Sequence, residues 1–234
     1  MKFIVLFVAI VAFAASAPTD IVNPEEAGEV EGDMIFDSFR SAIRGRRWSA
    51  KTLVYRFDSA LGSTQRSRAA SAVTILNNAL KGCITVRAYR SGDNVTPVTI
   101  RNGNGCSASV GYSSRNVMNL SSRCGVGNIV HEFLHNLGFF HEQSRSDRDK
   151  WVKIHFENIR SGLSGNFRKY TTSNSDNLGE DYDYGSIMHY PARAFSTNGQ
   201  NTITPLKSLG GKRMGQRSGL SAADVRKVKK AYGC

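Results

Sequence analysis

Residues 131–141 read His-Glu-Phe-Leu-His-Asn-Leu-Gly-Phe-Phe-His, a stretch with three histidines and one glutamate within eleven residues. His131 and His135 are four residues apart, so on a helix they project from one face and can bind the same metal ion. Glu132 can then reach a water molecule on the metal without being a ligand itself. A glycine-containing turn after the helix returns His141 toward the metal. Three neutral imidazoles leave one coordination position for water, which is the arrangement of a catalytic zinc site.

The alternative for this stretch is a helix with surface histidines and a buried glutamate. Average residue usage produces a chance His-Glu-x-x-His about once per hundred chains of this length, and a third histidine at a fixed offset makes such a match far rarer. Three of the five histidines of the chain fall within these eleven residues. The pattern therefore favours a metal site over scattered surface histidines.

A second segment, residues 181–190, reads Asp-Tyr-Asp-Tyr-Gly-Ser-Ile-Met-His-Tyr. Met188 within a turn would form an apolar floor beneath the zinc. The phenol of Tyr190 can bind zinc at rest or donate a hydrogen bond to an oxyanion during the reaction. Taken alone, this segment would indicate a turn with core packing. Beside the histidine motif, it predicts a second catalytic residue, Tyr190.

The remaining pattern predicts an α+β protein with a sheet-and-helix half, a central helix and a loop-rich half. Apolar periodicity and turn residues predict strands at 52–57, 84–89, 98–101, 108–112 and 116–120, and helices at 64–80, 127–137 and 221–232. A short helix is expected within 154–167. Ser221 can cap the last helix, and Asp224 completes an acidic variant of the capping box. A cleft between the two halves would lie beside the central helix.

The N-terminus has the layout of a secretory signal peptide. Lys2 precedes an uncharged apolar run over residues 3–15, and Ala15-Ser16-Ala17 is a small-residue cleavage site. We therefore expect a signal peptide at 1–17, with Ala14 as the competing end, and an extracellular protein. A membrane anchor is the alternative, but a span needs about 20 apolar residues, so no membrane association is expected.

Charge is distributed unevenly along the chain. Residues 18–40 carry a net charge of −6, whereas the chain from Ser41 onward carries +17. This contrast suggests a removable acidic segment held partly by charge on a basic body, although both could simply be solvated surfaces. Because the chain is secreted and has no nucleic-acid motif, we expect no nucleic acid partner. Protein or peptide substrates and anionic matrix surfaces are the expected partners, and we expect a monomer.

Four cysteines are present, and secretion favours their pairing into two disulfides with three possible connectivities. A cysteine zinc site is the alternative, but no Cys-x-x-Cys spacing occurs. Two glycosylation sequons, at Asn94 and Asn119, agree with secretion. Pro97 follows the Asn94 sequon directly and makes that site less favourable.

Together, HEFLHNLGFFHEQ at 131–143, SIMHY at 186–190 and the cysteine spacing resemble the astacin family of metzincin peptidases. The resemblance covers nearly the whole chain after the signal peptide. It implies a two-lobed metzincin fold and one zinc ion per chain. The residues it implies are the ligands His131, His135 and His141, the general base Glu132, the flexible ligand Tyr190, and the disulfides Cys83–Cys234 and Cys106–Cys124.

The same resemblance implies a latent precursor. Astacin-like precursors carry a Phe-x-Gly-Asp motif whose aspartate takes the place of water on zinc. Here the matching residues are Val30-Glu31-Gly32-Asp33, so Asp33 is the expected fourth ligand in the latent form. Cleavage after Arg40 would separate a propeptide at 18–40 from a peptidase domain at 41–234. An acidic residue in an unstructured leader is the alternative for Asp33.

The family likeness also gives a role to Glu142, whose counterpart meets the mature N-terminal ammonium inside the protein. The alternative for Glu142 is a surface salt bridge with Arg145 or Arg148. A substrate is expected to extend along an edge strand near residues 106–111. The loop 208–217 would border the pocket just after the cleaved bond, and its cations Lys212, Arg213 and Arg217 suggest a preference for acidic side chains.

The predicted function is hydrolysis of peptide bonds in proteins by a zinc-bound water, with Glu132 as base. Two rival classes remain open from the sequence. A zinc-binding protein without catalysis would require a loss of Glu132 or Tyr190, and both are present. A basic matrix-binding module with incidental histidines would bind no zinc.

Overall fold

A computed structural model of the chain describes residues 32–35, 47–172 and 176–234. The predicted signal peptide at 1–17 and the predicted cleavage site after Arg40 lie outside the described residues. The predicted propeptide at 18–40 is called the leader below. Its described residues, 32–35, lie on the body of the protein, and Met34–Ile35 form the short strand β1.

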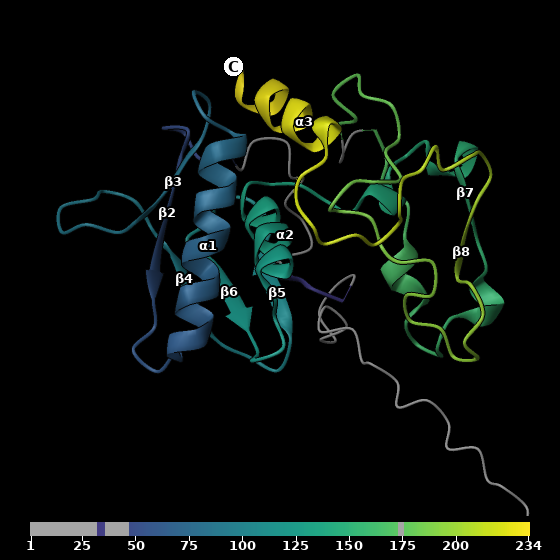
Figure 1. Ribbon diagram of the computed structural model, residues 1–234, viewed down its shortest axis with the longest axis horizontal. Helices are drawn as coiled ribbons and strands as arrows, with labels where there is room; N and C mark the ends of the chain where they lie inside the picture. The colour runs from purple at the N-terminus through teal and green to yellow at the C-terminus, as the bar shows by residue number, and fades with distance from the viewer. Residues whose placement is uncertain (1–31, 36–46, 173–175) are drawn as a thin grey trace, which may run out of the picture.

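The N-terminal half is built on a six-stranded sheet with strand order β1-β5-β6-β4-β2-β3. Neighbouring strands are parallel except for β5 and β6, which run antiparallel. The strands after β1 are β2 (Thr52–Phe57), β3 (Thr85–Ala88), β4 (Val98–Asn102), β5 (Cys106–Ser109) and β6 (Val117–Leu120). The leader strand β1 therefore occupies the edge of the sheet beside β5 (Figure 1).

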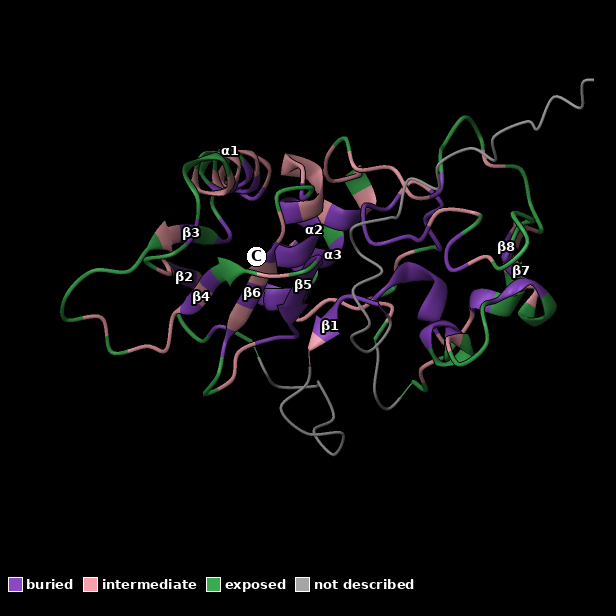
Figure 2. Ribbon diagram, turned by 90° about the horizontal axis from the view of Figure 1, so that it is seen from below, coloured by how far each residue is buried: buried purple, intermediate pink, exposed green. Residues whose placement is uncertain are grey.

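Two helices, α1 (Ser63–Ala79) and α2 (Val126–Asn136), cover one face of this sheet (Figure 2). Helix α1 buries Ala69, Ala72 and Leu76, whose spacing places them on one helical face. Helix α2 is buried over most of its length, and the rings of Phe133 and Tyr55 meet edge to face at 6.1 Å. The metal-binding motif thus belongs to a helix that is fixed within the main hydrophobic core.

The C-terminal half contains short 3-10 helices, long loops and a two-stranded sheet of β7 (Val152–Ile154) and β8 (Ile203–Pro205) (Figure 1). The 3-10 helices are η1 (Glu142–Ser144), η2 (Arg148–Lys150), η3 (Phe156–Asn158) and η4 (Ser164–Phe167). A second buried cluster, centred on Phe167 and Phe195, supports these loops. The α+β, two-lobed architecture predicted from the sequence is confirmed.

The last helix, α3 (Ala222–Tyr232), returns to the N-terminal half. The Tyr232 hydroxyl donates to the Leu137 carbonyl at 3.0 Å, and the Cys83–Cys234 disulfide ties the end of the chain to the segment after α1. The other disulfide is Cys106–Cys124, so the pairing implied by the family resemblance is confirmed. None of the helices among the described residues is long and apolar enough to cross a membrane.

One strand prediction is wrong in detail. The strand predicted at 108–112 is β5 at Cys106–Ser109, because Gly111 has a φ of +70° and donates its N–H to the His135 carbonyl instead of continuing the strand. The short helix expected within 154–167 is present as two separate 3-10 helices, η3 and η4. The capping box of Ser221 and Asp224 is confirmed at the start of α3.

Candidate metal centre

Helix α2 carries the first two histidines of the motif and ends directly after them. His131, Glu132 and His135 are fully buried, and the helix stops at Asn136. Gly138 then takes a φ of +97° and donates its N–H to the His135 carbonyl, which turns the chain back. This turn brings His141, also buried, against the other two imidazoles. The predicted local geometry of the motif is confirmed.

The three imidazoles converge through their Nε2 atoms. The Nε2 atoms of His131 and His141 lie 3.3 Å apart, and the three ring centroids are separated by 4.7, 4.8 and 5.3 Å. The Asp33 carboxylate completes the cluster, with its oxygens 3.1 Å from His131, 3.2 Å from His141 and 3.5 Å from His135. One ligand atom from each of the four side chains lies within 4.8 Å of the others.

The protonation of two of the rings follows from their other nitrogen. His131 Nδ1 lies 2.8 Å from the Ile187 carbonyl, and His135 Nδ1 lies 2.7 Å from the Phe139 carbonyl. A carbonyl only accepts, so each Nδ1 carries the proton and donates. The Nε2 lone pair of each neutral ring is therefore directed into the cluster, as metal-binding histidines require.

These side chains fit a zinc ion. His131 and His141 place their Nε2 atoms only 3.3 Å apart in a fully buried site, a separation suited to two nitrogens that bind one cation. Two nitrogen ligands at about 2.0 Å from a tetrahedral zinc are expected about 3.3 Å apart, which matches this separation. Three histidines and a carboxylate are ordinary zinc ligands, and the set is buried and closed.

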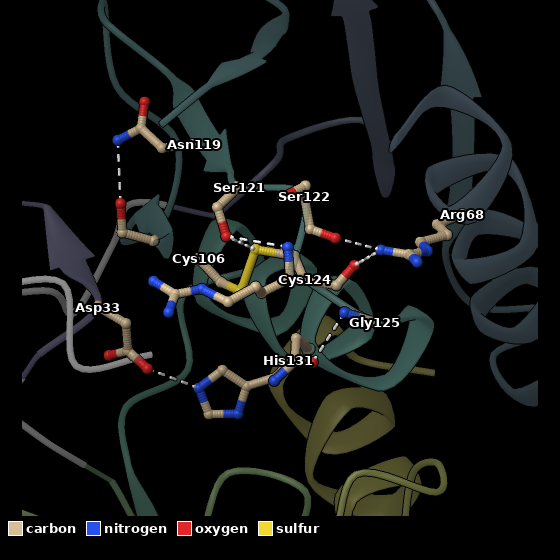
Figure 3. The surroundings of a disulfide bond; sticks show 12 residues. Asp33, Arg68, Cys106, Asn119, Ser121, Ser122, Cys124, Gly125 and His131 are labelled. Carbon is tan, nitrogen blue, oxygen red and sulfur yellow. Dashed lines mark hydrogen bonds and ion pairs between the residues drawn. A yellow bond between two sulfur atoms is a disulfide. The ribbon is translucent and has the colours of Figure 1, made fainter. Parts of the chain in front are cut away.

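Asp33 reaches the cluster from the leader. The Ala108 N–H donates to the Asp33 carbonyl at 2.8 Å, and β1 continues in parallel register with β5. The Asp33 carboxylate points at the His131 ring, close to the Cys106–Cys124 disulfide (Figure 3). With Nδ1 protonated on His131 and His135, the Asp33 carboxylate faces imidazole lone pairs rather than donors, an arrangement that a cation between them satisfies.

Comparison with known proteins places this geometry in a family. The family model described as Astacin (Peptidase family M12A) matches residues 41–233. The chain belongs to the astacin family. The zinc metalloproteinase nas-4 of Caenorhabditis elegans is 38% identical over 227 residues, which cover 91% of this chain and 71% of nas-4. Meprin A subunit beta of Homo sapiens is 35% identical over 211 residues, covering 87% of this chain but 29% of the meprin subunit.

A solved structure also supports membership of this family. High choriolytic enzyme 1, a hatching enzyme zinc-protease of Oryzias latipes, superposes with a TM-score of 0.70 and 31% identity. The match covers 80% of this chain and 93% of that enzyme. As a member of the astacin family, this chain is a zinc-dependent metalloendopeptidase, and His131, His135, His141 and Asp33 form the cluster able to hold the metal.

In this astacin-family chain, the 181–190 segment lies against the metal cluster. Tyr190 is 2% exposed, and its ring centroid is 4.5 Å from that of His141. The Tyr190 N–H donates to the side-chain carbonyl of Gln143 at 3.1 Å, and Phe167 packs edge to face on the tyrosine ring. Met188 is buried in the turn, and its carbonyl accepts the Glu142 N–H at 3.0 Å. The turn and the third histidine are thus fixed to each other.

Glu142 is buried rather than part of a surface salt bridge. Its carboxylate accepts from Arg145 at 3.1 Å, from the Asp183 N–H at 2.8 Å and from Lys227 of α3 at 2.6 Å. Lys227 is itself only 7% exposed, so the pair is enclosed between η1 and α3. Lys227 is not among the residues predicted from the sequence. It lies three residues after Asp224 and four before Ala231, on the face that α3 buries, and this spacing was the available signal.

The basic loop at 208–217 packs on the start of α2. A Cβ atom at Gly127 would lie 1.7 Å from the Arg217 carbonyl oxygen, so the close approach requires glycine there. Lys212 pairs with the buried Asp183 at 2.7 Å, and Arg217 donates to the His189 carbonyl at 3.2 Å. Arg213 is exposed. These three cations and Arg226 line an open cavity of about 1120 Å³.

Proposed function

We propose that this metalloendopeptidase is secreted as a latent precursor, in which Asp33 closes the zinc site until cleavage after Arg40 removes it. The observation that carries the proposal is the convergence of the Asp33 carboxylate on the three buried imidazoles. Zinc held by His131, His135 and His141 would supply Lewis-acid activation of water and polarisation of the substrate carbonyl. The protein side chains supply the proton transfer, the charge stabilisation and the latency.

Glu132 is proposed as the general base. It follows the ligand His131 on α2 and is fully buried, so its carboxylate acts in a low-dielectric environment beside the metal cluster. During hydrolysis it would take a proton from the attacking water and pass that proton to the leaving amine nitrogen. Because Glu132 is next to His131 on α2, the helix holds Glu132 at a fixed distance from the metal cluster.

Tyr190 is proposed to stabilise the oxyanion. Its ring is packed against His141, which supports a position beside the reacting carbonyl once Asp33 has left. A phenol hydroxyl that donates to the developing oxyanion acts mainly in the transition state. Tyr190 would therefore affect turnover more than substrate binding.

Latency is proposed to combine two contacts of the leader. Asp33 occupies the position that the catalytic water needs, and β1 fills the hydrogen-bonding edge of β5, where an extended substrate is expected. A substrate strand and β1 cannot pair with the same edge at once. Removal of the leader would therefore open both the metal and the substrate edge.

Secretion is supported by the two disulfides, since such bonds form in oxidising compartments. The basic charge of the body favours acidic protein substrates and anionic matrix surfaces. Within the 208–217 loop, we assign the preference for an acidic side chain after the cleaved bond chiefly to Arg213. Lys212 is partly neutralised by Asp183, whereas Arg213 is exposed.

The test is hydrolysis of casein by the chain cut after Arg40, with and without a zinc chelator, in wild type, Glu132→Ala and Glu157→Ala. Glu157 is a matched control because its side chain is 70% exposed on η3. We expect activity in the wild type and Glu157→Ala, and loss of activity with chelator or in Glu132→Ala. Glu132→Ala should still bind one zinc. Full activity of Glu132→Ala would exclude Glu132 as the base, and zinc binding without hydrolysis in the wild type would favour the non-catalytic alternative.

A further inference from the structure

A buried carboxylate at the start of α3 makes contacts that helix capping does not explain. Asp224 is 3% exposed, and its Oδ2 accepts from the Ser221 N–H at 2.9 Å, as the capping box requires. The same carboxylate also accepts from the Ser186 hydroxyl at 2.6 Å and from the Ile187 N–H at 2.9 Å. All three partners are donors, which is the pattern that an ionised carboxylate satisfies.

The contacts of Asp224 continue as far as a metal-binding histidine. The Ser186 hydroxyl oxygen accepts the Met188 N–H at 3.0 Å. The Met188 N–H and the Ile187 carbonyl belong to one peptide group, and that carbonyl accepts the Nδ1–H of His131 at 2.8 Å. A single hydrogen-bonded chain therefore runs from His131 through one peptide group and Ser186 to Asp224.

Every donor in this chain points toward the carboxylate. His131 donates to the Ile187 carbonyl, the Met188 N–H donates to Ser186, and Ser186 donates to Asp224. Hydrogen bonds aligned in one direction polarise one another, and they are stronger in a buried environment than in water. Ser186 and His131 are both fully buried. The negative charge at the end of the chain thus favours electron density on the imidazole that binds the metal.

A carboxylate that accepts the second ring N–H of a metal-bound histidine fixes the orientation of the ring and raises its basicity as a ligand. In this protein the carboxylate is separated from the histidine by a peptide group and a hydroxyl. The contact of His135 differs, because its Nδ1 bonds the Phe139 carbonyl in the turn that follows α2. His131 is therefore linked to a remote charge on α3.

We propose that Asp224 is a positioning residue of the zinc site, acting through Ser186 and the Ile187–Met188 peptide group on His131. This inference rests on the proposed zinc-dependent function of the same site. It assigns α3 a role in zinc binding in addition to its role in packing. The helix is held at its other end by the Cys83–Cys234 disulfide, so the carboxylate is fixed relative to the N-terminal half.

The experiment measures zinc affinity of the full chain by competition with a chelator, together with the visible absorption spectrum of the cobalt-substituted protein. Ser186→Ala breaks the hydrogen-bonded chain in the middle and leaves Asp224 with Ile187 and Ser221. Asp224→Asn removes the charge. Ser221→Ala is the matched control, because it removes the hydroxyl that caps the Asp224 N–H at 3.0 Å but leaves the chain to His131 intact.

We expect Ser186→Ala and Asp224→Asn each to weaken zinc binding by about tenfold and to shift the cobalt spectrum. The double variant should be little worse than either single variant, since both break one chain. Ser221→Ala should lower the melting temperature but leave the zinc affinity and the cobalt spectrum unchanged. If Asp224→Asn does not fold, Ser186→Ala carries the test alone.

Wild-type zinc affinity in Ser186→Ala would overturn the proposal. An equal loss in Ser221→Ala would also overturn it, because capping would then account for the effect. These readouts are independent of peptide hydrolysis. A chain that binds zinc but cleaves no substrate would contradict the proposed function and leave the positioning role to be decided by the zinc affinities.

Discussion

The Asp33 Oδ2 atom lies 3.1 Å from the Nε2 atom of His131, although the two residues are 98 positions apart in the chain. The strand pairing of Met34 and Ile35 with Ala108 and Ser109 holds the aspartate there. The contact with the histidines and the pairing along the sheet edge are therefore formed by one short segment. Separation of the leader from β5 would withdraw the carboxylate from the metal site at the same time.

Tyr190→Phe is expected to reduce turnover of the cut enzyme by about 10²-fold, with little change in KM, because the hydroxyl is needed mainly in the transition state. The phenyl ring keeps the packing on His141 and Phe167. Steady-state kinetics on a quenched fluorescent peptide measures both constants. A variant that raises KM alone would show that Tyr190 binds the substrate rather than stabilising the oxyanion.

The part of the site that follows from local spacing could be predicted from the sequence. His131 and His135 are one helical turn apart on α2, and the turn at Gly138 leads directly to His141. The spacing of the motif therefore nearly determines its geometry. The disulfide pairing and the role of Asp33 came from family resemblance, since no local pattern relates those residues to the histidines.

Contacts between distant segments could not be predicted. The capping box of Ser221 and Asp224 was visible in the sequence, but its link to Ser186 joins two motifs 38 positions apart. Lys227 meets Glu142 across 85 positions for the same reason. The predicted strand extended past the end of β5 because residues 108–112 are all apolar or small. The positive φ of Gly111, which the sequence does not show, marks where strand pairing stops.

Glu180 is expected to make stability depend on pH in acid. Hydrogen bonds from Arg226 and Lys230 lower the pKa of Glu180 to about 2, compared with about 4.3 in an unfolded chain. The unfolded state binds more protons between these values, so the stabilisation is present above about pH 4.3 and is lost as the pH falls toward 2. Because both cations are about half exposed, solvent screens these pairs, and we expect a small stabilisation that is largest at low salt.

Urea unfolding of wild type and Glu180→Gln at several pH values tests this expectation. The wild type should be the more stable protein at pH 6, and the difference should shrink as the pH is lowered toward 2. Added salt should also reduce the difference at pH 6. A difference that stays constant over the whole pH range would show that the ion pairs with Arg226 and Lys230 are not its source.

Arg213→Ala should reduce the enrichment of Asp and Glu immediately after the cleaved bond in a peptide library. Gln216→Ala is the comparison within the same loop, because it removes a neutral side chain that bonds the Gly185 and Gly219 carbonyls. We expect the acidic preference to persist in Gln216→Ala. No acidic preference in the wild-type enzyme would contradict the assignment altogether.

The most direct test of latency compares uncut chains that cannot be activated, all carrying Arg40→Ala, with and without Asp33→Ala. Asp37→Ala removes the same charge from the leader and serves as the control. Hydrolysis of a short quenched peptide is measured at equal zinc content. We predict measurable activity for Asp33→Ala, because loss of the contact with the histidines opens the metal site and leaves only the two-residue pairing of β1 to hold the leader on β5. No activity above background is expected for the parent or Asp37→Ala. Asp33→Ala activity as low as that of the parent would contradict the proposal that Asp33 closes the zinc site.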